Sequence, residues 1–191
     1  GLFYSTITEY LGFEINEGEF KVMSLSSFGK PIYEKELKEI FDINNFKINM
    51  DYFEFHKNPS KSFSKKLYDL FGEPYLDIRE EKNFNKYADI ASSAQLILEH
   101  TMKNLIQKAS DLSGKRKIVL TGGVALNCKM IHNLSKQSIF EELIVPPSPG
   151  DSGSAVGAAN FAFLEKSKNK TLNFSNIFLG PKKKLINKKE N

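Results

Sequence analysis

The sequence predicts an α/β fold in which helices flank a sheet, and three observations lead to that prediction. The chain has 191 residues, 40% hydrophobic and 26% charged, which suits one substantial soluble domain with its own core. Between residues 117 and 166 the pattern runs strand, loop, helix, strand, loop, helix, and a connection through a helix makes the two strands parallel. A long segment with helical periodicity precedes them and is expected to pack on the core.

The first part of the chain is expected to be mainly helical. Apolar residues recur at helical spacing in residues 2–11. Helices are also expected at residues 33–41 and 63–71, and the second of these is followed by Gly72, a common helix stop. Residues 46–55 alternate between apolar and polar side chains, which predicts one strand, or two strands forming a hairpin.

Residues 84–112 predict one long helix that is closed by Gly114 and buries a single stripe. The expected stripe consists of Tyr87, Ala91, Ala94, Leu98, Thr101, Leu105, Ala109 and Leu112. Further along, strands are predicted at residues 117–120 and 143–145, and helices at residues 126–138 and 154–166. Both strands run into Gly-rich loops, at the carboxyl ends where open α/β sheets bind their ligands.

The first Gly-rich loop, residues 121–127, reads Thr-Gly-Gly-Val-Ala-Leu-Asn. Gly122 and Gly123 have no side chain, so the backbone can turn sharply and approach a ligand closely. The start of the next helix carries about half a positive charge, which favours a phosphate. Asn127 adds an amide that both donates and accepts hydrogen bonds. The loop therefore predicts a phosphate-binding turn.

The second Gly-rich loop, residues 148–154, places Asp151 where a helix N-cap is expected. Asp151 could cap the helix, which contributes about 1 kcal/mol, or it could face a cleft as a metal ligand; composition favours neither. Gly153 and Gly157, with nearby alanines, would let the helix pack closely on a neighbour or a nucleotide. Neither loop is a P-loop, because no Gly-Lys-Ser/Thr follows at the required spacing.

The basic character of the chain is concentrated at its C-terminal end. Residues 181–191 hold five of the 27 basic residues and one of the 23 acidic ones, so the remainder carries 22 of each sign. We therefore interpret residues 181–191 as a basic tail or truncated linker, and we expect no nucleic-acid partner. No apolar run reaches the ~20 residues of a membrane helix, so no membrane partner is expected either.

The single cysteine, Cys128, permits no internal disulfide, which fits a cytoplasmic protein, and we expect a small buried side chain there. The histidines, His56, His100 and His132, are isolated in sequence and are expected at the surface or hydrogen-bonded. The chain opens on Gly1 and passes directly into a predicted helix, from which we expect a piece of a longer protein.

Four segments resemble the carbamoyltransferase family of nodulation, cephalosporin and aminoglycoside pathways. They are residues 17–29 (Glu-Gly-Glu-Phe-Lys-Val-Met-Ser-Leu-Ser-Ser-Phe-Gly), 88–95 (Ala-Asp-Ile-Ala-Ser-Ser-Ala-Gln), 122–128 (Gly-Gly-Val-Ala-Leu-Asn-Cys) and 149–153 (Pro-Gly-Asp-Ser-Gly). They follow the family's order, and the resemblance runs through residues 1–180. Ser24 and Ser26 stand where the family usually has Gly and Ala.

The resemblance implies that residues 1–180 are the C-terminal portion of the family's first domain. That domain is similar to the tRNA-threonylcarbamoyl transfer protein and has an actin-like, sugar-kinase-like ATPase fold, here a half-domain with a mixed sheet. The family forms carbamoyl-adenylate from carbamoyl phosphate and ATP in a second, YrdC-like domain. The first domain then transfers the carbamoyl group to a small-molecule hydroxyl acceptor, beside an iron-type divalent metal.

When the family's functional residues are carried over by position, the resemblance implies one metal ligand, Asp151. The implied nucleotide contacts are Gly122, Gly123, Val124, Asn127, Gly150, Ser152, Gly153 and Lys21, although Lys21 could equally be a surface lysine. The family's paired metal histidines lie upstream of this chain's matching part, so the upstream half-domain and the YrdC-like domain are expected partners, and a homodimer is also open. No general base is identified, no catalytic set is complete, and we expect the chain alone to be inactive.

Two other interpretations remain open at this stage. One is a fragment of another member of the actin-like superfamily, such as a sugar kinase. The other is a degenerate copy that acts as an interaction module without catalysis.

Overall fold

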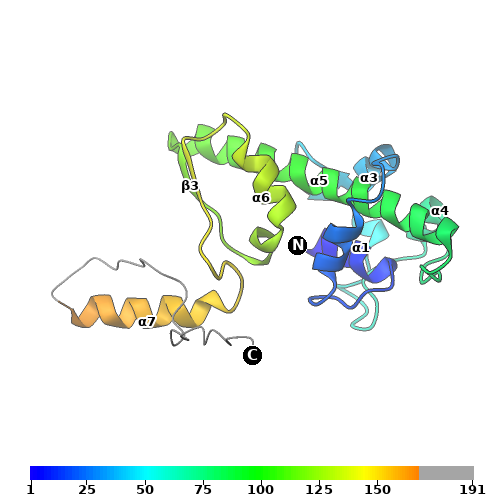
Figure 1. Ribbon diagram of the computed structural model, residues 1–191, viewed down its shortest axis with the longest axis horizontal. Coiled ribbons are helices and arrows are strands. Elements are labelled where there is room, and N and C mark those ends of the chain that lie inside the picture. Colours follow the sequence, from blue (N-terminus) through cyan, green and yellow to red (C-terminus); the bar gives the residue numbers. More distant parts are fainter. Residues whose placement is uncertain (168–191) are drawn as a thin grey trace, which may run out of the picture.

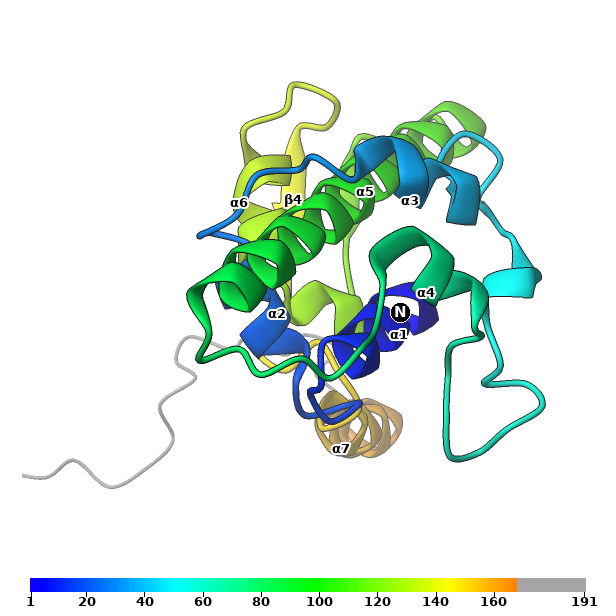
Figure 2. The same ribbon diagram turned by 90° about the vertical axis from the view of Figure 1, so that its right-hand side faces the viewer.

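Most of the chain packs along one long helix, α5 (Glu81–Ser113), which crosses the molecule in Figure 1. The structure is a computed structural model that describes residues 1–167. The helices that contact α5 are α1 (Leu2–Tyr10), α2 (Glu19–Leu25), α3 (Glu34–Ile40) and α6 (Cys128–Ser135). The core therefore lies on the faces of α5 that these helices cover (Figure 2).

The predicted long helix is confirmed, and its end at Gly114 has a clear cause. Gly114 is left-handed, with φ of 66°, and its amide donates to the carbonyl of Ser110. That conformation costs glycine little because it has no Cβ, so the helix stops there.

The predicted stripe is wrong in the second half of α5. Leu105 is 44% exposed and Leu112 is 80% exposed, whereas Ile106 is only 4% exposed and Ser110 is buried too. The buried positions after Leu98 advance in steps of four, at Met102, Ile106 and Ser110. Because a helix turns every 3.6 residues, steps of four rotate the buried stripe slowly around the helix, onto the side of its later packing partners.

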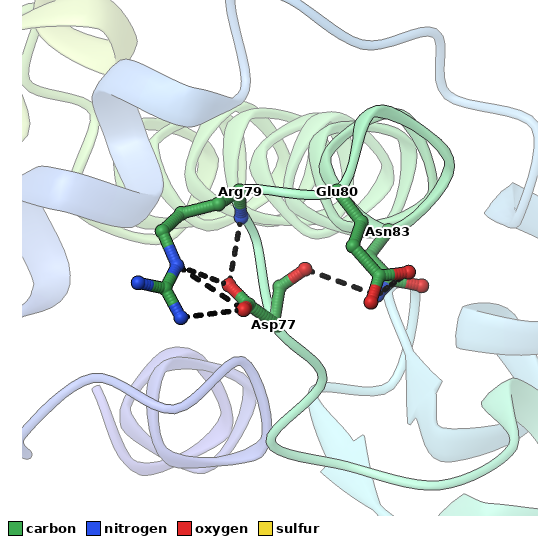
Figure 3. A network of polar contacts seen from close by, with 4 residues as sticks. All are labelled: Asp77, Arg79, Glu80 and Asn83. Carbon is green, nitrogen blue, oxygen red and sulfur yellow. Dashed lines mark hydrogen bonds and ion pairs between the residues drawn. The ribbon is translucent and has the colours of Figure 1, made fainter.

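The turn into α5 is closed by a small polar network (Figure 3). The backbone amide and guanidinium of Arg79 donate to the carboxylate of Asp77, and the closest guanidinium distance is 2.7 Å. The amide of Asn83 donates to the carbonyl of Asp77 over 3.0 Å and to the carboxylate of Glu80 over 3.3 Å. The N-cap residue Glu80 makes no side-chain cap, so this network holds the helix start instead. The ion pair is exposed, so water and salt screen it, and it adds little to stability.

The helices predicted at residues 2–11 and 33–41 are confirmed as α1 and α3, and that at residues 63–71 as the shorter α4 (Lys66–Phe71). A buried tyrosine joins α1 to the end of α4. Tyr10 is fully buried, donates to the carbonyl of Gly72 over 2.6 Å, and packs edge-on against Phe63 and Phe71. Burial raises the pKa of the Tyr10 hydroxyl well above its ordinary value, so the side chain stays a neutral donor.

The alternating segment at residues 46–55 forms less strand than predicted. Within it β2 (Lys47–Ile48) pairs antiparallel with β1 (Phe41–Asp42), which lies before the segment, and Phe53 is extended and forms a single antiparallel bridge with Phe63. The 3₁₀ turn η1 (Met50–Tyr52) follows, and the side chain of Asn49 accepts a hydrogen bond from the amide of Asp51. This local bond competes with strand pairing, which explains why the strand ends early.

The two strands predicted in the second half are confirmed and are parallel. β3 (Lys117–Val119) pairs with β4 (Glu142–Ile144), with Ile118 opposite Leu143, and the connection passes through η2 (Gly123–Leu126) and α6. The described residues thus form two separate two-stranded sheets with helices, an α/β arrangement, and not the single mixed sheet that was expected.

The last described helix, α7 (Gly153–Lys166), stands apart from the body in Figure 1. The predicted helix is confirmed, but none of its residues is buried by the rest of residues 1–167. The close approach expected at Gly157 is not seen among them, whereas Gly153 lies against the backbone of Ser148. None of the helices in that described range is both long and apolar enough to cross a bilayer. The predicted tail, residues 181–191, and the end of the predicted domain, residues 168–180, lie outside the described residues.

Candidate functional site

The two Gly-rich loops meet at one edge of the parallel sheet. The amide of Gly122 donates to the carbonyl of Pro149 over 2.7 Å. A Cβ placed on Gly150 would lie 3.5 Å from Cδ1 of Leu126 and 4.0 Å from Cα of Gly123. Parallel strands bring their carboxyl ends to the same edge, and β3 and β4 do so here. Residues 121–127 and 149–153 therefore form one continuous surface.

The first loop is anchored at one residue and open at its glycines. Gly122 has φ of 97°, a conformation that favours glycine, and it leads into η2. Ala125 is buried and holds the short helix in place. A Cβ on Gly123 would meet no atom of the described structure within 4 Å, so the approach to its backbone is open.

The second loop turns tightly into α7. A Cβ on Gly153 would overlap the carbonyl of Ser148, so this position requires glycine. The amide of Gly153 donates to the carbonyl of Gly150 over 2.9 Å, and the amide of Ser154 to the carbonyl of Asp151 over 3.0 Å. The N-cap residue is Ser152, and no side chain caps the helix. The capping interpretation of Asp151 is therefore wrong; its carboxylate is exposed, and the metal interpretation stays a prediction.

Asn127 occupies a more connected position than the sequence indicated. Its Oδ1 accepts from the amide of Met130 over 2.9 Å and so caps α6. The same side chain exchanges two hydrogen bonds with the amide of Gln95 on α5, at 2.9 and 3.0 Å. Asn127 is half-buried, whereas Gln95 is only 2% exposed.

Three further residues complete this polar cluster. The hydroxyl of Tyr4 donates to Oε1 of Gln95 over 3.0 Å, and Nε2 of Gln95 donates to the carboxylate of Glu99 over 2.8 Å. Asn133 on α6 donates to the other oxygen of Glu99 over 2.7 Å. Burial raises the pKa of the Tyr4 hydroxyl far above its ordinary value, so it remains a donor. We call Tyr4, Gln95, Glu99, Asn127 and Asn133 the Gln95 cluster.

The other two family-like segments pack against each other. A Cβ on Gly29 would overlap the backbone of Ala88. The amide of Lys30 donates to the carboxylate of Asp89 over 2.7 Å, and the amide of Tyr33 to the hydroxyl of Ser93 over 3.0 Å. These contacts fasten the turn after α2 to α5, so the residues that make them have a role in packing.

Two predicted side chains lie in surroundings that the sequence did not show. Lys21 is exposed, and its ammonium lies 5.8 Å from the ring centres of Phe13 and of Phe20, a cation–π geometry. The prediction that Cys128 is buried is wrong: it is exposed, with its sulfur 3.8 Å from that of Met23. Cys128 is the first residue of α6, where the side chain projects from the helix end.

The described residues do not form a metal centre by themselves. Within residues 1–167 no group of three His, Cys, Asp or Glu side chains lies close enough to hold a metal ion. Transition-metal sites in proteins use about three or four protein ligands. The implied metal therefore does not fit this part of the chain alone, and Asp151 could supply at most one ligand.

Two hollows lie elsewhere on the surface, on either side of His100 and Lys103 of α5. The first measures about 250 Å³ and is bordered by α6, and the second, about 530 Å³, by the β1–β2 turn. Neither includes a residue of the Gly-rich loops. Gly122, Gly123, Asp151 and Ser152 are exposed, so the candidate site is an open surface, and its polar backbone makes it a candidate.

The α/β arrangement and the two Gly-rich loops occur here in a chain that matches a known protein family. Residues 1–160 match the family described as Carbamoyltransferase N-terminus, so the chain belongs to that carbamoyltransferase family, as its four segments led us to expect.

Relatives of this chain occur in bacteria and an archaeon. It is 36% identical over 163 residues to the uncharacterized protein sll1178 of Synechocystis, covering 83% of this chain and 26% of the relative. It is 29% identical over 163 residues to the nodulation protein NolNO of Sinorhizobium fredii, covering 83% and 22%. It is 32% identical over 167 residues to the uncharacterized protein MJ1058 of Methanocaldococcus jannaschii, covering 86% and 26%. The chain thus spans about a quarter of the length of these relatives.

The sequence predicted the two loops but not the residues on α1 and α5 that are hydrogen-bonded, directly or through Gln95, to Asn127. Gln95 was noticed only as the end of a family-like segment, and Tyr4 and Glu99 were not singled out. A glutamine within a helix segment of otherwise small and apolar residues was a usable signal, because a buried amide needs partners.

Proposed function

We propose that this chain forms part of an ATP-dependent O-carbamoyltransferase that works in the cytoplasm. The reaction takes the carbamoyl group from carbamoyl phosphate through a carbamoyl-adenylate to the hydroxyl group of a small molecule. The supporting observation is the direct contact of the two Gly-rich loops through Gly122 and Pro149, within a chain of the carbamoyltransferase family. Residues 1–180 then correspond to the C-terminal portion of an actin-like, sugar-kinase-like domain.

The loops suit the anionic part of an adenylate. One part of the candidate site is the backbone of Gly122, Gly123 and Val124. The other part is the start of α7, a helix of 14 residues. The start of an α-helix carries a partial positive charge that favours a negative group. The amides of Gly153 and Ser154 are already bonded to the carbonyls of Gly150 and Asp151, so α7 would act mainly through this charge. Gly150, Ser152 and Gly153 would lie against the same group, and Lys21 is retained as a phosphate contact only by resemblance.

In the proposed reaction, negative charge develops on the phosphate group that leaves, and the amides of the loops would stabilise it. The acceptor oxygen forms a bond to the carbamoyl carbon, the bond from that carbon to the phosphate oxygen breaks, and AMP leaves with the electron pair. Amides that are already oriented stabilise this charge without reorganising. The acceptor hydroxyl must also lose its proton, and no residue of this chain is assigned as the base.

The proposal requires material beyond the described residues. Asp151 is proposed as one ligand of an iron-type divalent metal, with the others supplied from elsewhere. An upstream half-domain and a YrdC-like domain are the proposed partners, in keeping with the relatives, which are more than three times as long. Apolar surface for such contacts is present, because Phe161 of α7 is 69% exposed and Val119 of β3 is 64% exposed.

Nucleotide binding at the first loop can be tested by NMR titration of this chain with ATP. We expect millimolar ATP to shift the amide resonances of Gly122 and Gly123. The Gly123→Val variant should weaken binding about tenfold or more, since its side chain would occupy the open approach to the backbone without disturbing the fold. Ser60→Val is a matched control, because it puts the same side chain on an exposed loop elsewhere.

Two results would count against the proposal. One is a titration in which the loop resonances do not move at all. The other is an affinity for ATP that is the same in Gly123→Val as in the parent chain.

A further inference from the structure

We propose that the second hollow, which is bordered by α3, the β1–β2 turn and α5, binds a small organic acid in its ionised form. The acidic group would be held by Lys103, and the apolar body of the ligand would lie on Phe41 and Ile43. The hollow includes no residue of the Gly-rich loops. This second site therefore does not depend on the proposed nucleotide site.

The size and the apolar lining of the hollow suit a molecule larger than a simple ion. Small-molecule sites measure about 300–1,000 Å³, a range that includes the second hollow at about 530 Å³ but not the first at about 250 Å³. Ile43 is 8% exposed, and the ring of Phe41 packs 5.5 Å from that of the buried Phe3. The apolar lining thus belongs to the core and is formed without a ligand.

Lys103 is a cation of this hollow that lacks an acidic partner. Within residues 1–167 its ammonium makes no hydrogen bond and no ion pair. Glu99, four residues earlier on α5, is the partner expected on a helix. Both oxygens of Glu99 are occupied, however, one by Gln95 over 2.8 Å and the other by Asn133 over 2.7 Å. This explains why Glu99 does not pair with Lys103.

The acidic side chains nearest to the hollow are also occupied. The carboxylate of Glu34 pairs with the ammonium of Lys38 at 2.6 Å, and the exposed His100 interacts electrostatically with Glu34 as well. The carboxylate of Asp42 accepts three hydrogen bonds from the turn that follows it, over 2.7 to 3.1 Å. A ligand in the hollow therefore meets one ammonium, that of Lys103, which still needs an acceptor.

An ionised organic acid matches both the free cation and the apolar lining. Its charged oxygen would accept a charge-assisted hydrogen bond from Lys103, which is stronger than a bond between neutral groups. Its apolar body would remove the exposed part of Phe41 from water. A simple anion would use only an exposed lysine, whose field salt screens, and a neutral ring would use only the apolar lining.

The proposal can be tested by NMR titration of this chain with benzoate, which combines a ring with one negative charge. Acetate carries the charge without the ring, and benzyl alcohol carries the ring without the charge. We expect benzoate to shift the backbone amides of Asn44 and Asn104, which line the second hollow, and to bind about tenfold more tightly than either control.

Two lysine variants identify the hollow that binds. Lys103→Gln removes the unpaired charge at an exposed position, so the fold should be kept and affinity for benzoate should fall about tenfold, as for one lost charge-assisted hydrogen bond. Lys136→Gln is the matched control. Lys136 is exposed, its ammonium has no partner among residues 1–167, and it borders the first hollow but not the second. This variant should bind benzoate as the parent chain does.

Four results would overturn the inference. Shifts confined to Asn133 and Gln137, with loss of binding in Lys136→Gln, would place the anion in the first hollow. Equal affinity of Lys103→Gln and the parent chain would show that the ammonium is not used. Acetate or benzyl alcohol binding as tightly as benzoate would show that only one of the two features matters. The absence of any shift would rule out the site.

The two proposed sites are tested with different ligands and at different residues. The nucleotide site is tested with ATP at Gly122 and Gly123, and the second hollow with benzoate at Asn44 and Asn104. Either proposal can therefore fail without the other.

Discussion

At the scale of single residues, the family-like segments of this chain are explained mostly by close backbone contacts. Gly29 lies directly against the backbone of Ala88 on α5, and the neighbouring Lys30 amide is bonded to Asp89. A side chain at position 29 would clash with backbone atoms of Ala88 and Asp89, which cannot rotate away as a side chain could. The glycine is therefore required for packing rather than for a ligand.

Replacing Gly29 by alanine should destabilise the chain. The added methyl group would overlap the carbonyl of Ala88, and we expect a loss at the upper end of the ~1–3 kcal/mol typical of overpacking. Urea unfolding followed by circular dichroism would measure it. Gly157→Ala is the matched control, since a Cβ there meets no described atom within 4 Å. Equal stability of Gly29→Ala and the parent chain would show that the turn after α2 is not packed on α5.

At the scale of elements, periodicity and glycine stops predicted the helices well. α1, α3, α5 and α7 were all expected, α1 and α5 from their apolar spacing, whereas α2 was not, and the parallel pairing of β3 with β4 was expected from the order of elements. Which residues are buried in the second half of α5 was not predictable, because this depends on the element that packs against that part of the helix. The strand at residues 46–55 was overestimated, since alternation carries no information about the local hydrogen bond at Asn49.

The candidate site was predictable to a similar degree. The two loops meet because they follow parallel strands, whose carboxyl ends lie at the same edge of the sheet. The order of elements in the sequence already predicts this. The link between Gln95 and Asn127 joins positions 32 residues apart and depends on how α6 docks on α5. Local sequence patterns cannot supply that docking, so Asn127 was read as a nucleotide contact without its partner.

The rotation of the buried stripe in α5 gives an element-scale prediction. Ile106→Ala should cost about 2–5 kcal/mol of unfolding free energy, because it empties a buried site. Leu105→Ala, one residue away on the same helix, should change it by less than about 0.5 kcal/mol, since Leu105 is largely outside the core. Chemical denaturation of both variants decides between the two stripes. The reverse order of effects would restore the stripe predicted from the sequence.

At the scale of the whole molecule, the described residues divide into a well-buried body and an exposed apolar helix. The body gathers its large apolar side chains around α5. α7, which stands apart from the body in Figure 1, carries Val156, Phe161 and Phe163 as exposed side chains. An apolar helix of this kind is stable only when another surface covers it. The molecule therefore presents the two loops beside a surface suited to further protein.

From this arrangement we expect the chain alone to show no carbamoyl transfer. The loops lie on an open surface, where water reaches a bound adenylate, and the described residues hold neither a metal centre nor an assigned base. The assay supplies carbamoyl phosphate, ATP and a set of sugar hydroxyl acceptors, and detects carbamoylated product by mass spectrometry. Binding of ATP in the same preparation, seen by NMR, shows that the absence of product is not caused by unfolding. Product formed by the parent chain but not by Gly123→Val would contradict the expectation, because it would mean that these loops suffice for catalysis.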